Sequence, residues 1–154
     1  MADRDTTQQI IGDFGKTVGL DDLELDEAGY CCLVIDKNLV INIELDEPER
    51  RLMLYSLVGR PGPDRLPVPN MAMEANYLGR GTGGATLGVQ PEGGGIVLSR
   101  GVPLAGLDLP GFNGALERFV NTAEAWTKRL AEPAAEAEPA ATALDFPPAG
   151  GIRA

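Results

Sequence analysis

The 154-residue sequence contains no histidine. It therefore lacks the side chain that most often serves as a general base near neutral pH, which excludes Ser-His and Cys-His nucleophile pairs and histidine metal sites. Serine occurs only at Ser56 and Ser99. We expect no catalytic residues, no metal site and no cofactor, although carboxylate, lysine or tyrosine chemistry stays open.

Cysteine is also scarce, and the two that occur, Cys31 and Cys32, are neighbours in the chain. A disulfide between adjacent residues would be strained and would close no loop. We therefore expect two reduced cysteines in a strand, as is usual for a cytoplasmic protein.

Long hydrophobic runs are absent as well. No apolar run reaches the roughly 20 residues that a helix needs to cross a bilayer, so we expect no stable membrane insertion. The first residues do not have the basic and then apolar pattern of a signal peptide. These features predict a protein of the cytoplasm.

Positive charge is in short supply, with 13 Lys and Arg against 23 Asp and Glu and a formal net charge of -10. Binding to nucleic acid or to an anionic membrane is disfavoured, because carboxylates would be pressed against phosphates. Residues 1–49 hold thirteen acids and three bases, whereas residues 50–130 hold six acids and nine bases. The acidic first third either steers a basic partner or only maintains solubility.

Hydrophobic periodicity predicts a single α+β domain in the order α-β-β-β-α-β-β-α, with a twisted antiparallel sheet packed by helices. Residues 1–131 would form this domain, and the Ala-, Pro- and Glu-rich residues 132–154 would form a disordered tail. The proline-rich residues 60–69 are predicted to be a loop. The predicted helices are 6–19, 70–78 and about 110–130, and the predicted strands are 30–35, 39–46, 51–58, 85–90 and 95–100.

Two of the predicted strands are apolar on both sides. The strand at 30–35 is apolar throughout, so we expect both of its faces to be covered. In the strand at 51–58, Met53, Tyr55 and Leu57 lie on the face opposite the one expected to pack on helices. That second face needs cover from another helix, a partner subunit or a bound peptide, and the pattern does not choose among them.

Two polar segments could hold ligands. The glycine-rich residues 79–84 could present backbone amides to a phosphate, but they lack the P-loop ending and precede a predicted strand instead of a helix. We favour a flexible connection there. The acids at 21–27 could surround a hard cation, but their spacing is not that of a calcium loop. We expect a solvated strand face and a turn.

Several ordered motifs in this chain resemble the class I type III secretion chaperones, small acidic bacterial proteins that bind the N-terminal region of a secreted effector. The resemblance runs through residues 6–130. The segments that carry it are Ile-Ile-Gly-Asp-Phe-Gly-Lys-Thr-Val-Gly-Leu at 10–20, Leu-Asp-Glu-Ala-Gly-Tyr-Cys at 25–31, Met-Glu-Ala-Asn-Tyr at 73–77, Thr-Leu-Gly-Val at 86–89 and Phe-Val-Asn-Thr-Ala-Glu-Ala-Trp at 119–126.

The resemblance implies a homodimer that keeps part of an effector extended, without ATP hydrolysis. We expect the effector to dock apolar side chains into grooves beside the first helix and the sheet, or to add a strand to an open sheet edge. The expected effector-binding residues are Ile10, Phe14, Val18, Met53, Tyr55 and Leu57. The helix at 70–78 and the strand at 85–90 would form the dimer interface. The expected dimer residues are Met71, Met73, Tyr77, Leu87 and Val89.

Two alternatives stay open at this point. The first is a dimeric cytoplasmic adaptor or regulatory protein with the same fold, because fold alone does not fix the partner. The second, which we favour less, is a nucleotide-binding enzyme that uses the glycine-rich segment.

Overall fold

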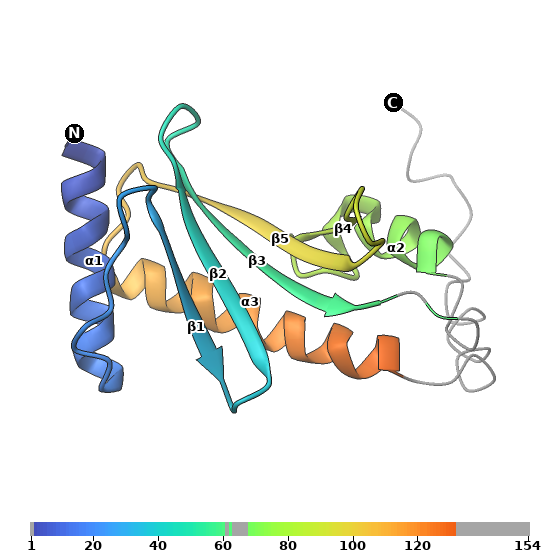
Figure 1. Ribbon diagram of the computed structural model, residues 1–154. Helices are drawn as coiled ribbons and strands as arrows, with labels where there is room; N and C mark the ends of the chain where they lie inside the picture. Colours follow the sequence, from blue (N-terminus) through green and yellow to red (C-terminus); the bar gives the residue numbers. More distant parts are fainter. Residues whose placement is uncertain (1, 61, 63–67, 132–154) are drawn as a thin grey trace, which may run out of the picture.

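The computed structural model describes residues 2–60, 62 and 68–131, so the predicted tail lies outside the described residues. The predicted order of helices and strands is confirmed (Figure 1). A single 3-10 turn, η1 (Tyr77–Gly79), follows the second helix. The other elements are α1 (Ala2–Val18), β1 (Tyr30–Ile35), β2 (Leu39–Asp46), β3 (Arg51–Gly59), α2 (Val68–Asn76), β4 (Thr86–Val89), β5 (Ile96–Pro103) and α3 (Leu109–Ala131).

The five strands form one sheet in the order β1-β2-β3-β5-β4, and every neighbouring pair is antiparallel. Successive side chains point to opposite faces, and along β2 they alternate between buried and exposed or half-buried. The buried face packs on α3, which runs along the sheet (Figure 1). This single layer of helix leaves the other face of the sheet uncovered by the described residues.

The long helix α3 supplies most of the apolar surface that the sheet packs against. Asp108 precedes it, and its Oδ1 accepts a hydrogen bond of 2.8 Å from the backbone N–H of Gly111, which caps the first turn. Its two largest fully buried side chains, Phe112 and Phe119, each contribute about 1.5–3 kcal/mol by leaving water. The buried side of α3 consists of Phe112, Ala115, Leu116, Phe119, Ala123, Trp126 and Leu130.

Helix α1 packs on α3 at one end of the sheet (Figure 1). The rings of Phe14 and Phe112 meet edge to face with their centroids 5.4 Å apart. The helix begins at Ala2, about a turn earlier than the sequence suggested. Asp3 and Asp5 lie in this first turn, where the helix dipole favours negative charge.

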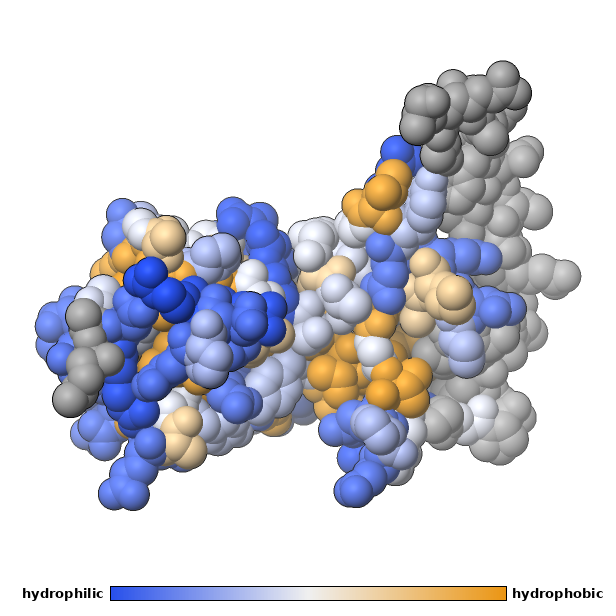
Figure 2. All heavy atoms as spheres, turned by 90° about the horizontal axis from the view of Figure 1, so that it is seen from above, coloured by the Kyte–Doolittle hydropathy of each residue, from blue (hydrophilic) through white to orange (hydrophobic). Residues whose placement is uncertain are grey.

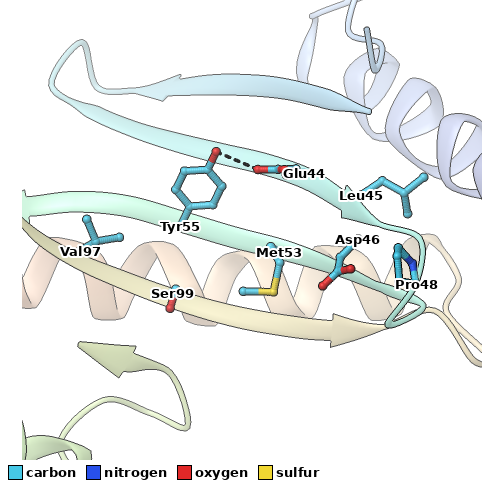
Figure 3. A pocket seen from close by; sticks show the side chains of 8 residues that line it. All are labelled: Glu44, Leu45, Asp46, Pro48, Met53, Tyr55, Val97 and Ser99. Carbon is cyan, nitrogen blue, oxygen red and sulfur yellow. Dashed lines mark hydrogen bonds between the residues drawn. The ribbon is translucent and has the colours of Figure 1, made fainter. Parts of the chain in front are cut away.

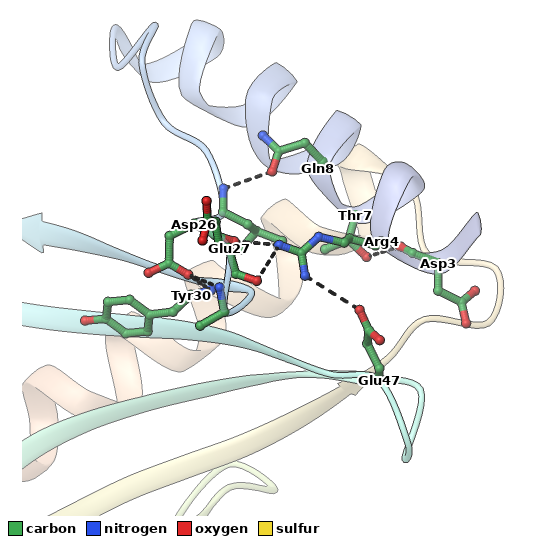
Figure 4. Close-up of polar contacts among 10 residues, drawn as sticks. Asp3, Arg4, Thr7, Gln8, Asp26, Glu27, Tyr30 and Glu47 are labelled. Atoms are coloured by element: carbon green, nitrogen blue, oxygen red, sulfur yellow. Dashed lines mark hydrogen bonds and ion pairs between the residues drawn. The ribbon is translucent and has the colours of Figure 1, made fainter. Parts of the chain in front are cut away.

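Two arginines join α1 to nearby turns, and Figure 4 shows the contacts of the first, Arg4. The Arg4 guanidinium donates to the backbone oxygens of Asp26 and Glu27 at 2.6 and 3.1 Å and pairs with Glu47 at 3.7 Å. Arg50 pairs with Asp3 at 2.8 Å and holds the pKa of that carboxyl below its usual value. These contacts set the position of α1 against the β2–β3 turn.

Some predicted boundaries were wrong. Helix α2 begins at Val68 and not at residue 70. Pro69 is tolerated there, because the N–H groups of a first helical turn have no hydrogen-bond partner within the helix, so a missing one costs nothing. It ends at Asn76, and Leu78 then adopts a positive φ of 53°. Residues 21–27 contain no strand, since Asp26 instead folds them into a turn through hydrogen bonds to the backbone N–H groups of Ala28 and Tyr30.

The expectation that both faces of β1 are covered was also wrong. Cys31 and Leu33 are buried, whereas Cys32 is exposed and Val34 is 60% exposed. The run of apolar residues resembled a strand between two layers, but β1 is the edge strand of a sheet that the described helices cover on one side.

Candidate protein-binding surface

The side chains that point away from α3 form a continuous surface on β1, β2, β3 and β5, which we call the open face. Strand pairing arranges them in rows that cross the strands. The rows are Val34, Val40, Leu57 and Val97; then Cys32, Asn42, Tyr55 and Ser99; then Tyr30, Glu44, Met53 and Gly101; and last Asp46, Arg51 and Pro103.

The open face changes from apolar at one end to charged at the other. Its first row is apolar, and Val34, Val40 and Leu57 in that row are each at least 40% exposed. Its last row carries charge, with Arg51 Nε 2.9 Å from a carboxylate oxygen of Asp46. A contiguous exposed apolar row on a sheet without a second layer is typical of a protein-binding surface.

Hydrogen bonds fix the polar side chains between these two ends. The Tyr30 hydroxyl donates to Asn42 Oδ1 at 2.8 Å, and Asn42 Nδ2 donates to the backbone oxygen of Tyr55 at 3.1 Å. The Tyr55 hydroxyl donates to Glu44 Oε2 at 3.1 Å. Burial, together with this bond to Glu44, raises the pKa of Tyr55 to about 12, so its hydroxyl stays a neutral donor.

A hollow of about 510 Å³ lies in the middle of the open face (Figure 3). Met53, Tyr55 and Val97 give it an apolar floor, and Glu44 and Asp46 stand at its rim. It is lined by Glu44, Leu45, Asp46, Pro48, Met53, Tyr55, Val97 and Ser99. The hollow can hold an apolar side chain beside negative charge.

The structure separates the residues that we expected to bind an effector. Met53, Tyr55 and Leu57 lie together on the open face. Ile10 is buried in the core, and Phe14 is half-buried against Phe112, so α1 offers less surface than its sequence suggested.

The remaining α1 residue, Val18, is 50% exposed at the end of that helix. Val34, Val40 and Val97 also belong to this surface, although they were not among the residues expected to bind an effector. The alternation along β2 could have revealed Val40, but the apolar run of β1 hid Val34.

A second apolar surface lies where α2 and η1 meet β4, and we call Met73, Tyr77, Leu78 and Val89 the α2–β4 patch. Met73 is 75% exposed, Leu78 71% and Val89 54%. In Figure 2 apolar side chains gather over the half of the molecule that holds α2 and β4, whereas hydrophilic ones dominate the half that holds α1.

The expected dimer residues divide between this patch and the interior. Met73, Tyr77 and Val89 are exposed in the patch, and Met71 is half-buried. Leu87 is buried in the core and so has almost no surface with which to contact a partner.

The glycine-rich segment has a structural role that explains its composition. Trp126 Nε1 donates to the backbone oxygen of Gly81 at 3.0 Å, and Thr82 is fully buried. A Cβ atom at Gly81 would lie 2.7 Å from the Cα of Ala75, so no larger residue fits there. The segment leads into β4 and not into a helix, so it lacks the helix N-terminus of a phosphate site.

Two other kinds of site are absent from the described ranges. Residues 2–60, 62 and 68–131 contain no group of three or more His, Cys, Asp or Glu side chains that could hold a metal ion. No helix in that same part of the chain is long and apolar enough to cross a membrane.

Comparisons with known proteins agree with this architecture. The chain resembles the solved structure of the ExsC-ExsE complex (TM-score 0.73, 22% identity, 82% of this chain and 95% of that chain covered). It also resembles the HopA1-SchA chaperone-effector complex (TM-score 0.70, 20% identity, 83% and 98% covered). A third match is the ExoU-SpcU complex from the type III secretion system of Pseudomonas aeruginosa (TM-score 0.59, 15% identity, 80% and 97% covered).

Among curated protein sequences no match was found. A family model, however, matches residues 9–127, which include both apolar surfaces. The chain therefore belongs to the Tir chaperone protein (CesT) family.

Proposed function

We propose that this protein is a type III secretion chaperone of the bacterial cytoplasm, which binds the N-terminal region of a secreted effector and keeps it soluble and competent for secretion without ATP. The observation that carries the proposal is the open face, a sheet surface with an exposed apolar row that none of the described helices covers. Membership of the Tir chaperone protein family and the chaperone-effector complex among the similar structures support it.

The effector would bind across the open face, with Met53, Tyr55 and Leu57 among its contacts and Phe14 and Val18 of α1 at the margin. Each Å² of apolar area buried contributes roughly 25 cal/mol, from which the cost of ordering a disordered segment must be subtracted. A long segment that covers several rows of the face is therefore needed for tight binding. Strand addition at the outer edge of β1 would extend this contact.

We further propose that the protein is a homodimer, with the α2–β4 patch and Met71 at the interface. Exposed apolar side chains gather there at the opposite end of the sheet from α1 (Figure 1). A dimer formed in this way would leave the open face of each subunit free for an effector.

The experiment that tests the function is a secretion assay in the native bacterium. The gene is deleted, and secreted proteins are compared after complementation with the wild type, with Tyr55→Asp or with Asn121→Asp. Asn121→Asp is the control, because it also adds one carboxylate but lies on the exposed side of α3, which packs on the other face of the sheet. We expect one secreted protein to be lost, and to be restored by the wild type and Asn121→Asp but not by Tyr55→Asp.

The same strains identify the partner by co-purification. A secreted protein should co-purify with the wild type and be lost with Tyr55→Asp, while circular dichroism shows that this variant is folded. Recovery of only resident cytoplasmic proteins, with secretion unchanged by the deletion, would contradict the proposal and indicate an adaptor of the same fold.

A further inference from the structure

We infer that the hollow in the open face selects its partner by charge as well as by apolarity: it takes an extended segment in which an apolar side chain is followed or preceded, two residues away, by a lysine or arginine. This inference rests on the proposed function, since it names the chemistry of the segment that the open face binds. The apolar side chain would fill the hollow, and the cation would pair with Glu44.

The hollow exists because the strand beside Met53 carries little side chain. Met53 on β3 is paired with Gly101 on β5, and Tyr55 is paired with the small Ser99. A Cβ atom at Gly101 would lie 3.6 Å from the Met53 sulfur and 3.1 Å from Arg51 Cδ, so the side chains of Met53 and Arg51 lie over Gly101. A larger residue at Ser99, which lines the hollow, would fill the space that an incoming side chain needs.

The two carboxylates at the rim, Glu44 and Asp46, differ in whether a positive charge already balances them. Asp46 is paired with Arg51 at 2.9 Å, so its charge is already neutralised. Glu44 accepts the Tyr55 hydroxyl at 3.1 Å, but it forms no ion pair with any residue in the described part of the chain. Because Tyr55 remains neutral, the negative charge of Glu44 is left for a partner to balance.

The spacing of the segment follows from the spacing of the strands. The hollow is lined from β2, β3 and β5, and Glu44 lines it from β2. The apolar side chain would enter beside Ser99, between β3 and β5, where the side chains are smallest. Strands are about 4.8 Å apart, so Glu44 is displaced from this point by about 7 Å across the sheet. Residues i and i+2 of an extended chain are also about 7 Å apart and point to the same side.

Charge complementarity excludes a second copy of this chain as the preferred occupant. The chain has a net charge of -10, and thirteen of its acids lie in the first 49 residues. A second copy would bring like charge toward Glu44 and Asp46, which is unfavourable. A separate segment with basic residues fits the rim better.

The test is a selection of random 12-residue peptides displayed on phage, with the purified full chain as bait. Peptides that also bind Ser99→Leu, in which the hollow is filled, are removed. We expect the surviving peptides to share a large apolar residue with Lys or Arg two positions away, and to bind the wild type about tenfold more tightly than Ser99→Leu.

Synthetic peptides then isolate the role of charge. Glu44→Gln should weaken binding of the best peptide about threefold to fivefold, as expected for one exposed ion pair. Glu117→Gln changes the net charge equally but lies on the exposed side of α3, so it should leave binding unchanged. Replacing the peptide's cation with glutamine should remove the difference between Glu44→Gln and the wild type.

The inference is overturned if no peptide survives, if the survivors lack the cation at that spacing, or if Glu44→Gln and Glu117→Gln behave alike. A Ser99→Leu variant that changes the oligomeric mass would also overturn it, because a second copy would then cover the hollow. The proposed function fails separately, in the secretion assay. If the peptides show the expected preference but no secreted partner is found, this inference holds and the proposed function fails. If a secreted partner is found but the peptides lack the preference, the proposed function holds and this inference fails.

Discussion

At the scale of single residues, Cys31 and Cys32 are neighbours in the chain with opposite surroundings. Cys31 points into the core and Cys32 lies on the open face, and both are free thiols, as the sequence predicted. Burial, reinforced by the nearby Cys32 and Asp26, raises the pKa of the Cys31 thiol from 9.0 to about 12. The folded state therefore holds this proton more tightly than the unfolded chain does.

This raised pKa predicts a loss of stability in alkaline solution. Below about pH 9 the thiol is protonated in both states, and its contribution to stability is fully present. Between pH 9 and about 12 it ionises in the unfolded chain but not in the folded one, so the free energy of unfolding falls as the pH rises. We expect Cys31→Ala to lessen this fall in urea unfolding measured from pH 7 to 11.

Cys32→Ala is the matched control, because Cys32 is exposed. This variant should keep most of the alkaline fall, because burial is the main cause of the raised pKa of Cys31 and the neighbouring Cys32 only adds to it. The raised pKa of Tyr55 contributes an alkaline loss to both variants. An equally steep fall in Cys31→Ala and in the wild type would contradict the assignment.

Single residues also show how far the sequence could predict the site. The alternation along β3 placed Met53, Tyr55 and Leu57 together correctly. Ile10 and Leu87 were expected at binding surfaces but are buried, because an apolar pattern identifies a face and not what covers it. The position of Glu44 beside Met53 depends on the pairing of β2 with β3, which no local pattern contains.

At the scale of elements, α2 is joined to β4 by one side-chain amide. Asn76 Nδ2 donates to the backbone oxygen of Leu87 at 2.9 Å, and the backbone N–H of Leu87 donates to Asn76 Oδ1 at 2.8 Å. The amide thus forms the pair of hydrogen bonds that a neighbouring strand would form. It protects the outer edge of β4 at this point.

We predict that Asn76→Ala lowers the free energy of unfolding by about 1–3 kcal/mol, because it leaves two partly buried backbone groups of Leu87 without their partner. Asn76→Asp should also destabilise, since a carboxylate cannot donate to the Leu87 oxygen. Urea unfolding at pH 7 measures both changes.

Asn121→Ala is the control, because Asn121 is exposed on α3 and alanine has the higher helix propensity. This variant should be neutral or slightly stabilised. If Asn76→Ala is as stable as Asn121→Ala, the amide does not hold α2 to β4.

Element order was predictable because each element has a clear period. The short turns favour antiparallel pairing of neighbouring strands, but they fix neither the register nor the pairing of β3 with β5. The boundaries were less predictable where tertiary contacts act. Helix α1 extends to Ala2, with Arg4 fixed by turns far along the chain. The glycine-rich segment was expected to be a flexible connection, but the hydrogen bond from Trp126 and the close approach of Ala75 to Gly81 give it a defined path.

At the scale of the whole molecule, the α2–β4 patch leads to a prediction about assembly. Sedimentation or light scattering at micromolar concentration should give twice the mass of one chain. Met73→Asp and Val89→Asp should each shift the protein toward the monomer, because a carboxylate would have to be buried without a partner. Both residues are exposed in the single subunit, so folding should be unaffected.

Val34→Asp is the control, since Val34 is similarly exposed but lies on the open face. This variant should keep the dimer mass while it weakens effector binding. A wild-type protein that is monomeric throughout the micromolar range would contradict the proposed interface, as would a dimer that Val34→Asp disrupts and Met73→Asp does not.

The single helical layer has a further consequence for how such a protein evolves. Residues that hold the subunit together lie on one face of the sheet, and the residues offered to a partner lie on the other, one position away along each strand. Mutations on the open face can therefore accumulate without disturbing the core. The scaffold can persist while the open face changes, and folds similar to this one occur at 20–22% sequence identity.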